Sequence, residues 1–160
     1  MIAAPIFNKL VIAHVGRAYI DADVGNAFDV LASTRNLYFD FSANTNDRVF
    51  EGMLRCVGPR RVLFGSDMPI LRMRMRRIER DGRYVSLVPK GLCGDVSRDR
   101  NMGEVEGAEA EALTFFLYEE LAAFRRAAER VGLSRADTED IFHNNAARLL
   151  KGAGGACLAQ

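Results

Sequence analysis

Cysteine is scarce in this sequence of 160 residues, and the three that occur are far apart: Cys56, Cys93 and Cys157. No CxxC pair is present, so nothing indicates a disulfide framework or a zinc knuckle. Widely spaced thiols are typical of a reducing compartment, and we predict a cytoplasmic protein. Long apolar runs are missing as well. None approaches 18 uninterrupted residues, so no transmembrane helix is predicted.

An excess of charge of one sign is also absent, since the formal net charge is +1. Such a balance gives no reason to expect nucleic acid or an anionic membrane as a partner. The one basic cluster, "RMRMRR" at residues 72–77, has no interleaved aromatic residues that would stack on bases. What the chain does contain is 49% hydrophobic residues, enough for one domain with a substantial core.

Three short apolar runs have the composition and length of buried strands: "KLVIAHV" (residues 9–15), "NLYFDFS" (36–42) and "RVLFGSD" (61–67). Residues 21–34, between the first two runs, and residues 45–58, between the second and third, carry apolar residues at helical spacing. The order strand, helix, strand, helix, strand is typical of parallel βαβ units, and it predicts an α/β fold.

Residues 70–107 interrupt this pattern with a long segment rich in arginine and glycine. Alternation around Asp81-Gly82 predicts a short hairpin, and connections of this length are often lids or binding loops, so we expect an insertion or lid here. Beyond it, one amphipathic helix is predicted over residues 109–132, followed by a last helix through "TEDIFHNNAARLL". The arginines that an anionic substrate could reach in the insertion are Arg72, Arg74 and Arg76.

Polar side chains lie near the carboxyl ends of all three predicted strands: His14, Asp40 and Asp67. In a parallel sheet these ends meet at one edge, where the ligand sites of α/β proteins lie. Each residue also has a simpler interpretation. An aspartate at a strand end can cap the next helix, which Pro69 after Asp67 would favour, and a lone histidine can be a hydrogen-bonded core residue. Convergence of all three on one edge favours a functional site.

Three motifs together resemble the amidohydrolase-related superfamily, and most closely its aminocarboxymuconate-semialdehyde decarboxylase-like branch. "IAHVG" at residues 12–16 is similar to the end of the family's sixth strand, "FGSDMP" at 64–69 to the end of its eighth, and "NAARL" at 145–149 to its last helix. The resemblance implies the C-terminal portion of a (β/α)₈ TIM barrel, strands six to eight with their following helices. Residues 1–160 would then be a single partial barrel domain.

The resemblance also implies a metal-dependent hydrolase. In this family a divalent metal, usually zinc, activates water for hydrolysis or decarboxylation of a small carboxylated substrate. Asp67 corresponds to the strand-eight aspartate that binds the metal and orients the water. His14 corresponds to the strand-six histidine, which is a metal ligand or the base that activates the water. Arg17 could bind a substrate carboxylate through its guanidinium, or could form a surface salt bridge.

The sequence departs from the family where most metal ligands would be. The strand-one His-x-His pair and the strand-five histidine are missing, and His14 and His143 are the only histidines. Zinc sites normally need three or four protein ligands, whereas this chain offers His14 and Asp67, with Asp40 as a poor third. A complete barrel needs roughly 250 residues. We therefore expect the C-terminal part of a hydrolase, inactive alone, with zinc bound firmly only in a full-length protein.

The alternative is a non-catalytic α/β domain that binds a ligand or a protein partner and has lost the metal. A three-stranded parallel sheet would also expose two edges, at residues 10–15 and 61–64, with uncovered apolar side chains such as Val11 and Val62. We expect such edges to favour association into homo-oligomers.

Overall fold

The first sheet of the molecule consists of three short parallel strands. The structure, a computed structural model, describes the backbone of residues 9–157 and side chains through residue 151. β1 (Leu10–Ile12), β2 (Leu37–Asp40) and β3 (Val62–Leu63) pair in the order β1-β2-β3, all parallel. The predicted parallel βαβ order is confirmed, and the chain has an α/β fold. Each strand is shorter than its apolar run, because the run continues into the turn after the strand.

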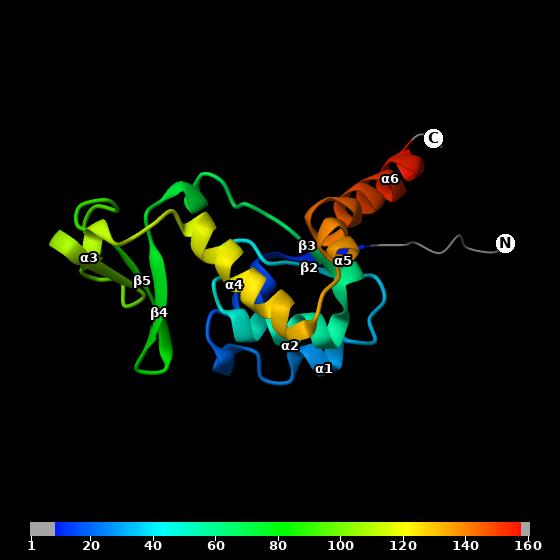
Figure 1. Ribbon diagram of the computed structural model, residues 1–160, viewed down its shortest axis with the longest axis horizontal. Coiled ribbons are helices and arrows are strands. Elements are labelled where there is room, and N and C mark those ends of the chain that lie inside the picture. The colour runs from blue at the N-terminus through cyan, green and yellow to red at the C-terminus, as the bar shows by residue number, and fades with distance from the viewer. Residues whose placement is uncertain (1–8, 158–160) are drawn as a thin grey trace.

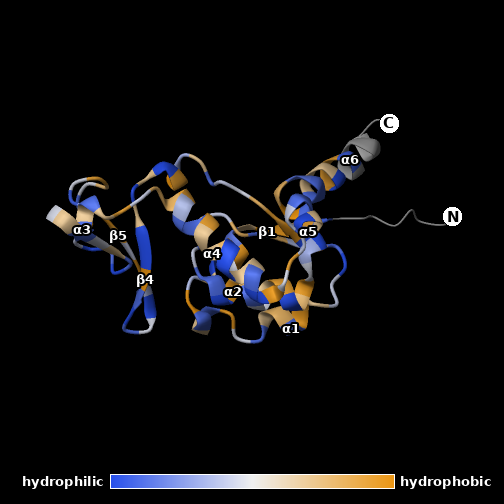
Figure 2. Cartoon of the chain, in the orientation of Figure 1, coloured by the Kyte–Doolittle hydropathy of each residue, from blue (hydrophilic) through white to orange (hydrophobic). Residues whose placement is uncertain are grey.

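α2 (Asp47–Val57) follows β2 within the boundaries that the sequence predicts. The Asn46 side chain accepts hydrogen bonds from the backbone N–H groups of Arg48 and Val49, which caps the start of the helix. Gly58, at a φ of 75°, ends it. Hydrophobic and hydrophilic residues alternate along α2 and α4 in Figure 2, as expected of helices with one buried face. The buried residues of α2 are Val49, Phe50, Met53, Leu54 and Val57.

The single helix predicted over residues 21–34 is divided into two pieces. A 3-10 turn, η2 (Asp21–Asp23), comes first, and α1 (Ala27–Leu31) follows after Gly25. Gly25 has a φ of 51°, in the left-handed region, so the backbone cannot continue as one right-handed helix. Phe28 of α1 still reaches the core, where it is buried.

Residues 76–89 form the hairpin that the sequence predicts. β4 (Arg76–Arg80) and β5 (Arg83–Pro89) pair antiparallel around Asp81 and Gly82. Both turn residues have positive φ, 53° and 69°, as a two-residue type I′ turn requires. This local turn chemistry explains why the hairpin can be predicted from a short stretch of sequence.

A third strand in this segment was not predicted. β6 (Met102–Val105) pairs parallel with β5 and completes a second sheet in the order β4-β5-β6. Its sequence, "MGEV", has weak strand character because it contains glycine and glutamate. Gly103 lies opposite Leu87, and a Cβ at Gly103 would come within 3.1 Å of the Leu87 side chain. The glycine therefore allows β6 to pack closely against the side chains of β5.

The helix predicted over residues 109–132 is two helices. α3 (Gly107–Glu111) ends before α4 (Phe116–Val131) begins. Between them the backbone pairs with the chain that leads into β4: the Phe116 N–H donates to the carbonyl of Met73, with an N···O distance of 2.9 Å. This hydrogen bond and the bridge between Arg74 and Phe115 separate α3 from α4. Gly132, at φ 75° and ψ 39°, ends α4 as predicted.

The chain continues into one helical stretch made of α5 (Arg135–Glu139), the π-helical turn η5 (Asp140–Asn144) and α6 (Asn145–Cys157). A capping box starts it: the Asp137 N–H donates to Ser134 Oγ, and the Ser134 N–H donates to Asp137 Oδ2. Figure 1 shows α6 extending away from the first sheet. No helix within residues 9–157 is long and apolar enough to cross a membrane.

Phenylalanine rings fill the core between the first sheet and the helices. Phe41, directly after β2, is fully buried, and its ring stacks on that of Phe124 in α4 with centroids 4.7 Å apart. It also meets Phe50 of α2 at 5.3 Å, while Phe64 and Phe142 stack at 4.8 Å. Such aromatic pairs are worth about 0.5–1.5 kcal/mol each beyond their buried area. The best-packed part of the core therefore lies beside the carboxyl end of β2.

The two edges of the first sheet differ, which corrects the prediction that both would be exposed. At β3 the Phe64 N–H donates to the Ile141 carbonyl at 3.0 Å, and Asn145 Nδ2 donates to the Val62 carbonyl at 2.8 Å. Val62 is fully buried as a result. The C-terminal helical stretch thus covers the β3 edge. Among the described residues, no strand other than β2 pairs with β1, and Leu10 is 60% exposed.

Candidate functional site

The three polar residues predicted at the strand ends lie at one edge of the first sheet. His14 comes two residues after β1, Asp40 ends β2, and Asp67 comes four residues after β3. Because the strands are parallel, their carboxyl ends meet at this edge. His14 and Asp67 have positive φ values, 56° and 40°. Residues other than glycine rarely adopt this conformation, and it is often found at functional sites.

One oxygen of Asp40 joins the turns that follow β1 and β2. Asp40 Oδ1 accepts hydrogen bonds from the His14 backbone N–H at 3.0 Å, from the Ser42 backbone N–H at 3.0 Å and from the Ser42 hydroxyl at 2.5 Å. Three donors on one carboxylate oxygen fix the positions of both turns. Asp40 therefore acts here as an acceptor for the surrounding chain.

The His14 ring is oriented by Ser42. His14 Nδ1 lies 3.1 Å from the Ser42 carbonyl oxygen and 2.9 Å from Ser42 Oγ. A carbonyl oxygen can only accept, so Nδ1 carries the hydrogen and donates it. Ser42 Oγ can accept from the same N–H while its own hydrogen goes to Asp40. This arrangement leaves the lone pair of the neutral imidazole on Nε2, the atom that could accept a proton or bind a cation.

Gly65 lets the third strand approach this cluster. A Cβ at Gly65 would lie 3.1 Å from Ser42 Cβ, 3.4 Å from Ser42 Oγ and 3.5 Å from Asp40 Oδ1. The first of these distances is shorter than ordinary carbon contacts, so a side chain here would push the chain after β3 away from Ser42. The glycine of "FGSD" therefore lets the segment that carries Asp67 lie close to Ser42 and Asp40.

A buried carboxyl group that was not predicted lies beside the same edge. Glu120 of α4 is fully buried, and its Oε2 accepts the Ala43 backbone N–H at 2.7 Å. Its Oε1 is also buried and has no hydrogen-bond partner among the described residues. Burial, with the nearby negative charges of Asp40 and Asp67, raises the pKa of Glu120 to about 8, although the Ala43 N–H acts to lower it. Glu120 is therefore mainly protonated at neutral pH.

The sequence contains a signal for this burial. Glu120 lies four residues after Phe116 and four before Phe124, on the apolar face of α4. A glutamate at such a position is either exposed by a distortion of the helix or buried with it, and in this molecule it is buried. The other buried residues of α4 are Phe116, Ala123, Phe124 and Ala127.

Of the three arginines predicted to be available to an anionic substrate, Arg72 is exposed, whereas Arg74 and Arg76 bind other parts of the protein. Arg74 donates to backbone carbonyls at the end of α3, and Arg76 forms an ion pair with a glutamate of α4. Both are therefore engaged by the protein itself. Arg77, on the opposite face of β4, points inward and lies 3.9 Å from the centre of the Tyr19 ring. Its Nη1 donates to the carbonyl oxygen of Ala43.

Arg17 is exposed in the turn that contains His14. Its guanidinium carbon lies 5.9 Å from the centre of the Tyr19 ring. The side chains of Tyr84 and Tyr19 raise its pKa above the ordinary arginine value, so it carries a full positive charge. A charged, exposed guanidinium near His14 has the chemistry needed to pair with a carboxylate.

The described residues do not form a metal site of the kind that the resemblance implies. Among them, no three His, Cys, Asp or Glu side chains lie close enough together to hold a metal ion. His14 Nδ1 is occupied by Ser42, and Asp40 Oδ1 by three donors. His14 Nε2 and Asp67 are fewer ligands than a zinc ion normally requires.

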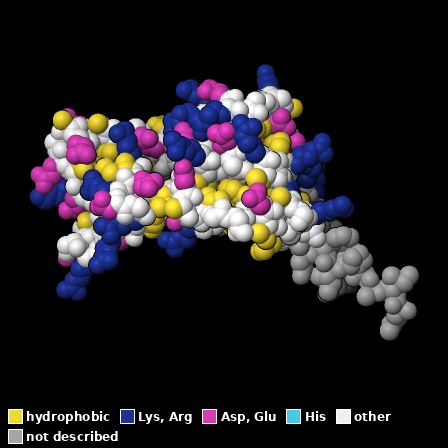
Figure 3. Space-filling model, turned by 90° about the horizontal axis from the view of Figure 1, so that it is seen from below, with side chains coloured by type: hydrophobic (Ala, Val, Ile, Leu, Met, Phe, Trp, Pro, Cys, Tyr) yellow, Lys and Arg dark blue, Asp and Glu magenta, His cyan; other side chains and the backbone are white. Residues whose placement is uncertain are grey.

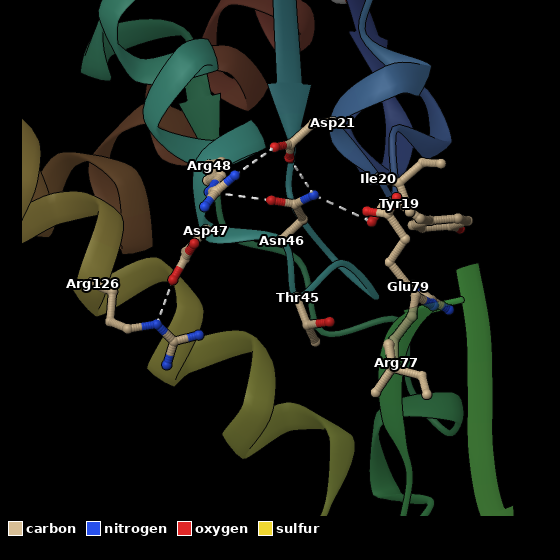
Figure 4. A pocket seen from close by; sticks show the side chains of 11 residues that line it. Tyr19, Ile20, Asp21, Thr45, Asn46, Asp47, Arg48, Arg77, Glu79 and Arg126 are labelled. Carbon is tan, nitrogen blue, oxygen red and sulfur yellow. Dashed lines mark hydrogen bonds and ion pairs between the residues drawn. The ribbon is translucent and has the colours of Figure 1, made fainter. Parts of the chain in front are cut away.

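A polar cavity of 250 Å³ opens beside this edge (Figure 4). The turn after β1 contributes Tyr19 and Asp21, the start of α2 contributes Asn46 and Arg48, and β4 contributes Arg77. Asp21 accepts from Asn46 at 2.9 Å and from Arg48 at 3.3 Å, so these polar groups satisfy one another. His14 and Asp67 do not line this cavity. Basic and acidic side chains are also intermixed over the face seen in Figure 3.

The comparisons with known proteins agree with the motifs at this edge. The family model described as amidohydrolase matches residues 4–83, half of the chain. A crystal structure of an amidohydrolase from Burkholderia multivorans, with bound HEPES, is similar with a TM-score of 0.51 and 16% identity. The match covers 88% of this chain and 44% of that chain, so this chain spans less than half the length of that protein. The search of curated proteins found no match. This chain belongs to the amidohydrolase family.

Proposed function

We propose that the chain forms the C-terminal part of a hydrolase site, in which water attacks a small carboxylated substrate. The observation that supports this most directly is the hydrogen-bond chain from Asp40 through Ser42 to His14. It holds the imidazole with the Nδ1 hydrogen directed at Ser42, at the edge of the sheet where α/β enzymes bind substrates. In the neutral ring the lone pair is then on Nε2.

Three residues have roles in this proposal. His14 Nε2 accepts a proton from the attacking water and can return it to the leaving group. Asp67, at the same edge, accepts a hydrogen bond from the second O–H of that water and so orients it. Arg17 pairs with the carboxylate of the substrate. Decarboxylation, which the aminocarboxymuconate-semialdehyde decarboxylase-like motifs favour, is the competing reaction at the same site.

Amidohydrolases generally use divalent metals, but the described residues of this chain do not fit one by themselves. We propose that polypeptide outside this sequence supplies the remaining ligands of a divalent metal, zinc by the family pattern. The isolated chain would then bind zinc weakly and hydrolyse nothing. The 44% coverage of the solved amidohydrolase supports this view.

The second candidate is a non-catalytic α/β domain that binds a carboxylated ligand. The lack of three grouped metal ligands among the described residues favours it. In that case Arg17 would bind the ligand, and the orientation of His14 would have no consequence for turnover.

Substitution of the two histidines separates these candidates. The protein is expressed from its complete reading frame and supplied with Zn²⁺, and acid release from a panel of carboxylated lactones and amides is followed at constant pH. His14→Asn and Asp67→Asn should each abolish turnover, whereas His143→Asn, the matched control on the exposed side of η5, should leave it intact. Full activity in His14→Asn would overturn the hydrolase proposal. Ligand binding without turnover in the wild-type protein, lost in Arg17→Ala, would favour the binding domain.

A further inference from the structure

The peptide group between Ser42 and Ala43 connects two ionisable residues that do not touch each other. Its carbonyl oxygen, on Ser42, accepts from His14 Nδ1 at 3.1 Å. Its N–H, on Ala43, donates to Glu120 Oε2 at 2.7 Å. A trans peptide is planar and places its C=O and N–H on opposite sides, so a force on one group turns the other. Glu120 and His14 therefore hold the same rigid unit from its two ends.

Ala43 needs such support. It has a φ of 51°, which is unfavourable for a residue with a Cβ, and it is buried. Its own carbonyl accepts from Arg77 Nη1 of β4. Both hydrogen-bonding groups of one strained residue are thus held by side chains from distant elements. We call this arrangement, Glu120 and Arg77 on Ala43, the Ala43 clamp.

Each side chain of the Ala43 clamp is in an unusual environment. Glu120 is a carboxyl group with no exposed surface, on the apolar face of a helix, and its second oxygen lacks a partner among the described residues. Arg77 is half-buried, and its guanidinium packs against aromatic rings, 3.9 Å from the ring centre of Tyr19 and 5.0 Å from that of Phe116. Removing either polar group from water has a free-energy cost. The hydrogen bonds to Ala43 offer a reason why both side chains are held in these positions.

We infer that Glu120 is a positioning residue: through the Ser42–Ala43 peptide it fixes the orientation and the tautomer of His14. Arg77 holds the next carbonyl and so links the insertion to the same peptide. Hydrogen bonds that share a peptide group also polarise one another, so a stronger acceptor at the Ala43 N–H makes the Ser42 carbonyl a stronger acceptor for His14 Nδ1–H. The consequence for catalysis rests on the proposed function, whereas the link itself does not.

NMR of the purified chain tests the link without any activity. Glu120 changes charge between about pH 7 and pH 9, given its pKa of about 8. Asp40 and Asp67 are the other ionisable groups whose charges act on Glu120, and His14 and Arg77 are those joined to it through the Ser42 and Ala43 peptide groups. In the wild type, the Ala43 amide proton and the His14 Nδ1 resonance should shift together over this range. In Glu120→Gln, which keeps an oxygen acceptor but cannot ionise, neither should show this step.

A His14 signal that does not follow Ala43 in the wild type, or that keeps the step in Glu120→Gln, overturns the inference. Glu119→Gln, one residue away and partly exposed, is the matched control and should behave like the wild type. His143 in the same spectra should show no step linked to Glu120.

Kinetics then test the consequence. In the active protein, Glu120→Leu removes the acceptor and should lower kcat about tenfold to hundredfold, with little change in KM, as for other residues that orient a working histidine. An unchanged kcat in a folded Glu120→Leu protein overturns the positioning role. If the NMR link holds but no variant or wild-type protein turns over substrate, the proposed function fails while the link between Glu120 and His14 stands.

Discussion

The two sheets of this molecule are held together in different ways. The first sheet, β1-β2-β3, has only two to four residues in each strand, and its stability comes from the phenylalanine cluster and from the helices packed around it. The second sheet, β4-β5-β6, has a hairpin with five paired positions and a tight two-residue turn, and its apolar clusters are small. In Figure 1 the second sheet projects from the end of α4, away from α1 and α2.

This difference explains how each region relates to the proposed site. The first sheet brings together residues that are far apart in sequence, so its carboxyl edge can assemble His14, Asp40 and Asp67. The second sheet is a local unit that reaches the site chiefly through Arg77. The Ala43 clamp joins the turn after β2 to α4 through Glu120 and to the second sheet through Arg77, and the Tyr84 ring of β5 also contacts Tyr19, with centroids 4.8 Å apart.

The largest expected effect is a pH dependence of stability that comes from the burial of Glu120. Glu120 has a raised pKa in the folded state, so its stabilising contribution is complete below its unfolded value of about 4.5 and is lost as the pH rises through about 8. The shift corresponds to roughly 4 to 5 kcal/mol in the free energy of unfolding. Urea denaturation at a series of pH values should show this decline in the wild type and a much flatter profile in Glu120→Gln. Equal slopes in both proteins would contradict the assignment.

Shortening one buried side chain beside each sheet should show that the two sheets unfold independently of each other. Phe41→Ala should lower the free energy of unfolding by about 4 kcal/mol, because it removes a fully buried ring from the phenylalanine cluster. Leu87→Ala in β5 should cost about 2 to 3 kcal/mol and act mainly on the hairpin. Amide hydrogen exchange is the measurement: Leu87→Ala should speed exchange in β4 and β5 while β2 stays protected. Uniform loss of protection would mean that the two sheets unfold as one unit.

Loss of the arginine in the Ala43 clamp should be smaller. Arg77→Met keeps an apolar stem between the aromatic rings but leaves the Ala43 carbonyl without its donor, at a cost of about 1 to 3 kcal/mol. Arg76→Met, the neighbouring residue on the outer face of β4, removes only a surface ion pair and should cost less than about 1 kcal/mol. Thermal unfolding compares the two variants, and equal costs would argue that Arg77 is not held at Ala43.

A change at the β1 edge should have the smallest effect on folding. Its main effect should be on association between copies of the chain. Light scattering coupled to size exclusion should show association of the purified chain through β1, where Val11 is 36% exposed. Val11→Lys should shift the chain toward the monomer, because a lysine on an edge strand opposes strand pairing. Val30→Lys, at an exposed position of α1, is the control and should change nothing. A monomeric wild-type protein would contradict the prediction of homo-oligomers.

Local features of the fold were predictable from the sequence. α2 lies within the predicted residues 45–58, α4 ends at the predicted residue 132, and Asp81-Gly82 forms the predicted hairpin turn. Each depends on the φ, ψ preferences of a few adjacent residues. The order of the parallel strands also followed from the pattern of apolar runs. β6 and the break between α3 and α4 escaped prediction, because both depend on backbone partners elsewhere in the chain.

The sequence by itself determined that polar residues would stand at the ends of parallel strands, since residue order and strand direction suffice for that. Tertiary structure alone decided what those residues do to one another. The burial of Glu120 depends on which elements cover α4. The inward direction of Arg77 depends on how the hairpin packs against the rest of the chain. The cover over β3 depends on helices some eighty residues later in the chain. These contacts join distant segments, and local propensity carries no information about which distant groups will meet.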